Sequence, residues 1–101
     1  GKIVTLSSQM GSVQSAASDS LAYRVSKAAV NKLMRGLAAE LKPQGIPVLI
    51  VHPGWVKTEM GGDGAQLKPE ESASQLLKLI DKFDLASTGR FLAWNGKELA
   101  W

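Results

Sequence analysis

Tyr23 and Lys27 are the two residues in this sequence whose types and spacing most clearly suggest chemistry. Because they are four residues apart, they share one face of the chain if the stretch between them is helical. A nearby ammonium group favours the phenolate, so we expect Lys27 to lower the pKa of Tyr23 from its usual value of about 10. A tyrosine tuned in this way can exchange a proton with a substrate oxygen near neutral pH.

Two further segments with polar or turn-forming residues lie on either side of this pair in the sequence. Ser7-Ser8-Gln9-Met10-Gly11 follows a short apolar run, and Pro53-Gly54-Trp55-Val56-Lys57-Thr58 follows another. Serines before a glycine, or a Pro-Gly pair, usually form no more than a turn, so each motif alone is a weak signal. Both follow predicted strands, however, and ligands of open parallel α/β sheets bind at the carboxyl ends of strands. The order of the motifs along the chain therefore favours a single site.

The elements that must position these residues follow from the hydrophobic pattern. Apolar runs predict buried strands at 3–6, 46–51 and 89–94, a helical period predicts a helix over 21–41, and Pro69 begins a second helix. The apolar residues expected to face the core are Val25, Ala28, Ala29, Leu33, Leu37 and Leu41 in the first helix, and Ala73, Leu76, Leu77, Ile80 and Phe83 in the second. Strand, helix, strand, helix, strand is the order of a parallel α/β sheet.

Length and composition exclude several classes of protein. The 101 residues suffice for one small domain, and 45% hydrophobic with 21% charged residues is ordinary for a globular chain. There is no cysteine, which excludes disulfides and thiolate metal sites, and the net charge of +3 is scattered without interleaved aromatics. We therefore expect no nucleic-acid partner, no membrane partner and a cytoplasmic location. The sequence starts at Gly1 and not at Met, so we expect the true N-terminus to be missing.

Other residues that could carry chemistry are better explained as structural. His52 is the single histidine and ends a predicted buried strand, so we expect a hydrogen-bonded structural residue and not a base. One histidine without cysteine makes no zinc site, and the sequence has no Gly-x-Ser-x-Gly motif for a nucleophilic serine. Trp94 and Trp101 are expected to pack at the edge of a strand.

Taken together, the motifs make the whole chain resemble the C-terminal half of a short-chain dehydrogenase/reductase. The family pattern is a serine after a strand, Tyr-x-x-x-Lys opening a helix, and Pro-Gly-x-x-x-Thr after the next strand. The ending Phe91-Leu92-Ala93-Trp94-Asn95-Gly96-Lys97-Glu98-Leu99 is most similar to the branch of C-factor and Sniffer-like carbonyl reductases. The resemblance implies an α/β fold: the C-terminal part of a Rossmann-type doubly wound parallel sheet. Residues 1–101 would then be one partial domain, with three strands, two main helices and no nucleotide-binding half.

The resemblance also implies a role for each matching residue. Tyr23 would be the general acid/base on the substrate, Lys27 would assist it and hold the nicotinamide ribose, and Ser8 would hold the substrate oxygen. The residues implied to contact the cofactor, besides Tyr23 and Lys27, are Pro53, Gly54, Val56 and Thr58. The reaction would be reduction of a carbonyl or oxidation of an alcohol in a small molecule. The cofactor would be NADP or NAD, with NADP favoured by the branch.

The chain departs from the family pattern in two places. The segment between Ser8 and Tyr23 is slightly longer than usual, which leaves Ser7 or Ser12 as alternatives for the serine role. More importantly, no strand–turn–helix carries the glycine-rich turn that binds the pyrophosphate. The alternative hypothesis is therefore a catalytically inactive truncated protein or an interaction module. A homo-oligomer through the alanine-rich helix at 21–42 would fit either hypothesis.

Overall fold

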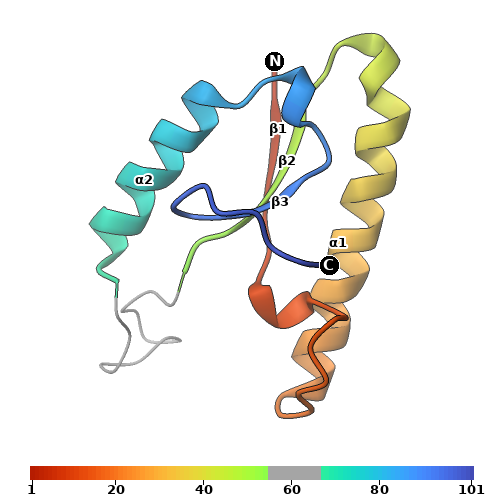
Figure 1. The fold of residues 1–101 in the computed structure, drawn as a ribbon, viewed down its shortest axis with the longest axis vertical. Coiled ribbons are helices and arrows are strands. Elements are labelled where there is room, and N and C mark those ends of the chain that lie inside the picture. Colours follow the sequence, from red (N-terminus) through yellow and green to blue (C-terminus); the bar gives the residue numbers. More distant parts are fainter. Residues whose placement is uncertain (55–66) are drawn as a thin grey trace.

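A computed structural model describes residues 1–54 and 67–101 (Figure 1). Its elements are β1 (Ile3–Leu6), η1 (Gln9–Gly11), α1 (Leu21–Leu41), η2 (Lys42–Gln44), β2 (Val48–His52), α2 (Pro69–Lys82), η3 (Leu85–Ser87) and β3 (Phe91–Ala93). The three strands form one sheet in the order β1-β2-β3, and both pairings are parallel. The expected α/β class with parallel strands is confirmed.

The central strand β2 explains why the sheet forms from these residues. Its side chains are each fully buried at Val48, Leu49, Ile50 and Val51. A near-continuous run of β-branched and aliphatic residues is expected where helices cover both faces of a parallel sheet. Alternate side chains point to opposite faces. Val48 and Ile50 join the core on the α1 side, whereas Leu49 and Val51 join the core on the α2 side.

The molecule has three layers, with α1 and α2 on opposite sides of the sheet (Figure 1). One core contains Ala38 of α1 and Phe91 of β3, together with the side chains of β2 on that side. The other contains Phe83, which follows α2, and Leu92 of β3. Within the described residues, neither helix combines the length and apolar content needed to cross a membrane.

The helix α1 has the predicted bounds, but the face that it turns to the sheet differs from the prediction. Val25 and Leu33, expected in the core, are 60% and 69% exposed. The prediction was right for Ala28, Leu37 and Leu41, which are half-buried, and wrong for Ala29, which is exposed as well. The inward face also contains Tyr23, Lys27, Asn31, Met34 and Ala38, all buried or half-buried. The prediction failed in part because the sequence is apolar or alanine over a wide arc of this helix.

In α2 the prediction of the inward face is partly wrong as well. Leu76 and Ile80 pack against the core as expected, together with Leu79. Ala73 and Leu77 were also expected in the core, but both are exposed, Leu77 by 64%. Phe83 is buried, as predicted, although it lies one residue beyond the helix.

The C-terminal segment folds back along β3. The Leu99 N–H donates to the carbonyl oxygen of Phe91 at 2.8 Å, and the ring of Trp101 stacks on the Phe91 ring with centroids 5.3 Å apart. The Val13 N–H also donates to the carbonyl oxygen of Trp101. The predicted packing role of Trp101 at the edge of the sheet is confirmed, and β3 is shorter than expected because turns flank it at Gly89 and Gly96.

Candidate active site

The carboxyl edge of the sheet brings the candidate segments together. Ser8 caps the short helix η1 just after β1, and Pro53 and Gly54 follow the end of β2. Since α1 returns along the sheet, its first turns, which carry Tyr23, start from this same edge. In Figure 1, η1 lies beside these first turns.

Tyr23 and Lys27 lie on one face of α1, as their spacing predicts. The Lys27 Nζ is 5.6 Å from the centroid of the Tyr23 ring, within the range of a cation–π contact. Both side chains are half-buried, so each can still be reached from outside the core. The neighbouring Arg24 is engaged elsewhere, because its Nη2 pairs with Asp19 Oδ1 at 2.9 Å.

Ser8 is buried, and its hydroxyl oxygen accepts the N–H of Met10 at 3.1 Å. This contact caps the first turn of η1. A serine hydroxyl has one proton to donate besides its acceptor lone pairs. The capping bond therefore leaves the proton of Ser8 available for a ligand oxygen.

Ser7, one of the two alternatives to Ser8, has a different task. Its Oγ donates to Oδ1 of Asn31 at 2.5 Å, and both residues are buried. This bond joins the end of β1 to the third turn of α1. Because the Ser7 proton is used in that bond, the geometry favours Ser8 over Ser7 as the donor to a ligand.

Asn31 is a site residue that the sequence reasoning missed. It is 3% exposed, and its Nδ2 has no hydrogen-bond partner among the described residues. The spacing in the sequence could have revealed it, since Asn31 is four residues after Lys27 and eight after Tyr23, on the same face of the helix. A polar residue that continues the line of the candidate pair Tyr23 and Lys27 could have been predicted to be buried and hydrogen bonded.

Gly11 sets how closely η1 approaches α1. A Cβ at this position would lie 2.8 Å from the carbonyl carbon of Lys27 and 2.9 Å from the nitrogen of Ala28, closer than real Cβ contacts come. The turn that follows Ser8 therefore rests on the backbone of α1 at Lys27 itself. Ser12, the other alternative to Ser8, ends η1 by donating its N–H to the Gln9 carbonyl oxygen at 3.0 Å.

His52 holds the same turn from the side of β2. Its Nδ1 accepts the N–H of Gln9 at 3.1 Å, which confirms the expectation of a hydrogen-bonded residue. Burial lowers the pKa of His52 below its ordinary value of 6.5. Of the described residues, no group of three or more His, Cys, Asp or Glu could hold a metal ion.

The Pro53–Gly54 segment is fixed by two contacts. The carbonyl oxygen of Pro53 accepts the Ser72 hydroxyl at 2.6 Å. Gly54 has a φ of 90°, and a Cβ there would meet Leu67 and lie 2.8 Å from Cδ1 of Trp94. Only glycine suits this conformation without strain. The other two predicted cofactor contacts, Val56 and Thr58, lie outside the described residues.

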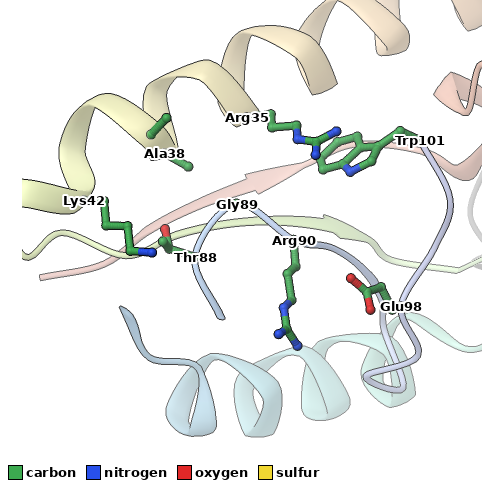
Figure 2. A pocket seen from close by; sticks show the side chains of 9 residues that line it. Arg35, Ala38, Lys42, Thr88, Gly89, Arg90, Glu98 and Trp101 are labelled. Carbon is green, nitrogen blue, oxygen red and sulfur yellow. The ribbon is translucent and has the colours of Figure 1, made fainter. Parts of the chain in front are cut away.

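A hollow of about 350 Å³ lies elsewhere, along the second half of α1 (Figure 2). Its lining residues are Arg35, Ala38, Ala39, Lys42, Thr88, Gly89, Arg90, Glu98 and Trp101. The Arg35 guanidinium lies over the Trp101 ring at 4.9 Å, and Figure 2 shows Arg90 pointing away from that ring and Lys42 pointing toward Thr88. None of the described candidate residues lines this hollow, so it is separate from the candidate site.

Comparison with known proteins gives consistent matches. A family model described as enoyl-(acyl carrier protein) reductase matches residues 1–98. The chain is 37% identical over 101 residues to the C-signal of Myxococcus xanthus, with 99% of the chain aligned. It spans 61% of the length of that relative.

Solved structures of carbonyl reductases are also similar to this chain. The carbonyl reductase Sniffer of D. melanogaster superimposes with a TM-score of 0.93 at 40% identity, and an NADPH-bound carbonyl reductase from chicken fatty liver with 0.91 at 37%. Both comparisons cover all of this chain but only 41% and 43% of the other chains. The chain therefore corresponds to about two fifths of each of these structures.

Proposed function

The chain belongs to the short-chain dehydrogenase/reductase family, and we propose that residues 1–101 form the catalytic half of an NAD(P)-dependent oxidoreductase. The substrate would be a small carbonyl compound or the corresponding alcohol, as the names of the two similar structures suggest. The NADPH in one of those structures favours NADP over NAD.

The residues present fit one end of such a cofactor. Ser8 and Tyr23 offer hydroxyl groups and Lys27 offers an ammonium group, which suit a ribose and a reacting oxygen. Gly54 adds backbone N–H and C=O groups just after β2, at the same edge of the sheet. Within residues 1–54 and 67–101, no glycine-rich turn joins a strand to a helix and could hold the phosphates, so the fit is limited to the nicotinamide end.

When bound, the nicotinamide supplies or accepts the hydride. Tyr23 donates its phenolic proton to the carbonyl oxygen during reduction, or accepts a proton from the alcohol during oxidation. Ser8 donates its free proton to the same oxygen and so orients the substrate. Lys27 holds a ribose hydroxyl, and its ammonium group lies 5.6 Å from the centroid of the Tyr23 ring.

One observation carries this proposal: the Tyr23–Lys27 pair shares a face of α1 on which the Ser8 turn is packed. Ser7 bonds to Asn31, and Gly11 rests on the backbone at Lys27. Ser7 before Ser8 and Gly11 after it are thus both in contact with this helix. Pre-organised donors of this kind need no rearrangement during the reaction.

The test is Tyr23→Phe in the protein expressed from its complete gene. Loss of the phenol proton should lower kcat for a model ketone by about 10²- to 10⁴-fold, the usual worth of a positioned acid. The Kd for NADPH should change little, because the ring and Lys27 remain. Circular dichroism and a thermal melt check that the variant is folded. Turnover close to the unchanged protein would refute the role of Tyr23.

A second candidate is a non-catalytic interaction module that self-associates through residues 21–42. The outer face of α1 supports it, because Val25 and Leu33 are 60% and 69% exposed. Titration of the folded 101-residue chain with NADPH and NADH, together with its mass in solution, separates the two candidates. Binding tighter than millimolar with turnover of a ketone would rule out the module, whereas a dimer without cofactor binding would support it.

A further inference from the structure

The turn that carries Ser8 is held by three contacts, and one of them comes from an ionisable side chain. Ser7 bonds to Asn31, Gly11 packs on the backbone of α1, and the Gln9 N–H donates to His52. The first two contacts join the turn to α1. The third joins it to the end of β2, directly before Pro53–Gly54.

We propose that His52 is a positioning residue: its neutral imidazole accepts the Gln9 N–H and thereby keeps the hydroxyl of Ser8 directed at the substrate oxygen. This inference rests on the proposed function, in which Ser8 orients the substrate. His52 itself need not touch substrate or cofactor.

The local geometry of η1 explains why this contact matters. The first N–H groups of a helix have no partner within the helix and need an outside acceptor. Here Ser8 Oγ takes the N–H of Met10, and His52 Nδ1 takes the N–H of Gln9. If His52 offered no acceptor, the Gln9 N–H would be left without this partner. The turn that carries Ser8 would then lose its contact with β2, and the Ser8 hydroxyl would be held less firmly in its present position.

The contact requires one protonation state. Nδ1 can accept a hydrogen bond only when it carries no proton, so the imidazole must be neutral with its proton on Nε2. Burial already lowers the pKa of His52, which keeps the ring neutral at physiological pH. Once the pH falls through this lowered pKa, Nδ1 becomes a donor that faces the Gln9 N–H, and the contact is lost.

The charged groups on the elements packed against His52 lie on α1. His52 alternates with Val48 and Ile50, whose side chains pack on the α1 side, so it points toward α1. The ionisable side chains on the first two turns of α1 are Tyr23, Arg24 and Lys27, and Arg24 is paired with Asp19. Among the described elements, η1, β1 and β3 add none. Burial is the cause of the lowered pKa of His52.

Three variants of the protein expressed from its complete gene test the proposal. His52→Leu removes the acceptor, and we expect kcat to fall about 10- to 100-fold, as a small misplacement of a reacting group can cost. The Kd for NADPH should stay within about twofold. His52→Asn places an oxygen where Nδ1 was, so it should restore most of the lost kcat.

The matched control is Thr88→Val, at the other end of β2. Thr88 Oγ1 accepts the Val48 N–H at 2.8 Å, so this variant also removes a side-chain acceptor from a backbone amide. It should lower the melting temperature about as much as His52→Leu does but leave kcat unchanged. An equal fall of kcat in both variants would show that His52 affects activity only through the stability of the fold, and would overturn the proposal.

A pH profile and an NMR titration complete the test. In the reduction direction Tyr23 acts in its protonated form, so it causes no loss of rate at low pH. We expect kcat to fall as the pH drops below 6.5, and His52→Asn to lack this loss. The ¹⁵N signals should show Nδ1 of His52 unprotonated at pH 7.5, with the Gln9 amide shifting as the imidazole titrates.

The NMR result does not depend on activity, so the two proposals can fail separately. A Gln9 amide that ignores the titration of His52 would overturn the present inference, even if Tyr23→Phe is inactive. Full activity of Tyr23→Phe would instead refute the proposed function of the site, whatever the imidazole does.

Discussion

Two adjacent serines at the end of β1 have separate tasks. Ser7 points its hydroxyl into the buried contact with Asn31, whereas Ser8 caps η1 and keeps a free proton. A buried hydroxyl bonded to a buried amide is costly to disturb from one side only, because the remaining partner stays in the core without a bond. The order of the two serines in sequence therefore decides which of them can face a ligand.

A double-mutant cycle on Ser7 and Asn31 tests this division. Asn31→Leu should lower the free energy of unfolding by about 1–3 kcal/mol, because the Ser7 hydroxyl is then buried without a partner. Ser7→Ala should also destabilise, and the double variant should cost less than the sum of the two. Urea unfolding of the four proteins measures the coupling. Strictly additive costs would contradict a direct bond.

Spacing alone identified some of these side chains and missed others. Tyr23 and Lys27 were found because residues four positions apart in a helix lie next to each other on its surface. His52 was expected to be hydrogen bonded, but its partner Gln9 could not be named, because the contact joins the ends of two different strands. Asn31 was overlooked, since a polar residue in the middle of a helix is usually exposed to solvent.

The close contact between η1 and α1 depends on a glycine, Gly11. Gly11 lies against the backbone at Lys27 and Ala28, where a methyl group has no room. Backbone cannot move aside as the end of a flexible side chain can. The distance between these two elements, and with it the place of Ser8 relative to Lys27, is therefore fixed by a glycine.

Gly11→Ala should push η1 off α1. We expect a loss of about 1–3 kcal/mol in the free energy of unfolding, as overpacked cores show, and a lower kcat. Gly36→Ala is the matched control, because Gly36 lies in α1 with nothing within 4 Å of its added Cβ. An alanine inside a helix should stabilise by about 0.5–1 kcal/mol. Urea unfolding measures both; a neutral Gly11→Ala would contradict close packing.

The bounds of the elements were easier to predict than their orientation. The strand at 3–6 and the helix at 21–41 agree with the structure, because proline, glycine and apolar period mark ends clearly. The inward face of α1 was predicted wrongly at Val25 and Leu33. A wide apolar arc permits several rotations of a helix, and the choice depends on contacts such as Ser7 with Asn31, which are distant in sequence.

The C-terminal residues connect parts of the molecule that the helices leave apart. Trp101 stacks on Phe91 of β3, lies under the guanidinium of Arg35 of α1, and accepts the Val13 N–H through its carbonyl oxygen. One aromatic side chain thus covers the end of the hydrophobic core on the α1 side of the sheet. Its backbone reaches the segment between Ser8 and Tyr23, which precedes the candidate site helix.

Replacement of Trp101 should therefore weaken the whole molecule. Trp101→Ala should lower the free energy of unfolding by about 2–3 kcal/mol, less than for a fully buried aromatic ring because Trp101 is half-buried. Trp101→Phe should recover part of this through stacking on Phe91, worth about 0.5–1.5 kcal/mol. Arg35→Met should cost less than about 1 kcal/mol. Thermal and urea unfolding measure all three, and a stable Trp101→Ala would contradict the closing role.

The parallel pairing of β1 with β2 also has a kinetic consequence. Ile3 pairs with Val48, and Ile50 with Phe91, so every strand contact in the sheet must wait for a long loop to close. Folding rates fall as contacts become less local, because loop entropy is lost before any pairing compensates for it. The helix α1, whose backbone hydrogen bonds are local, can form early. The carboxyl edge of the sheet, which carries the candidate site, then assembles late, and a chain stalled before that step exposes unpaired, aggregation-prone strands.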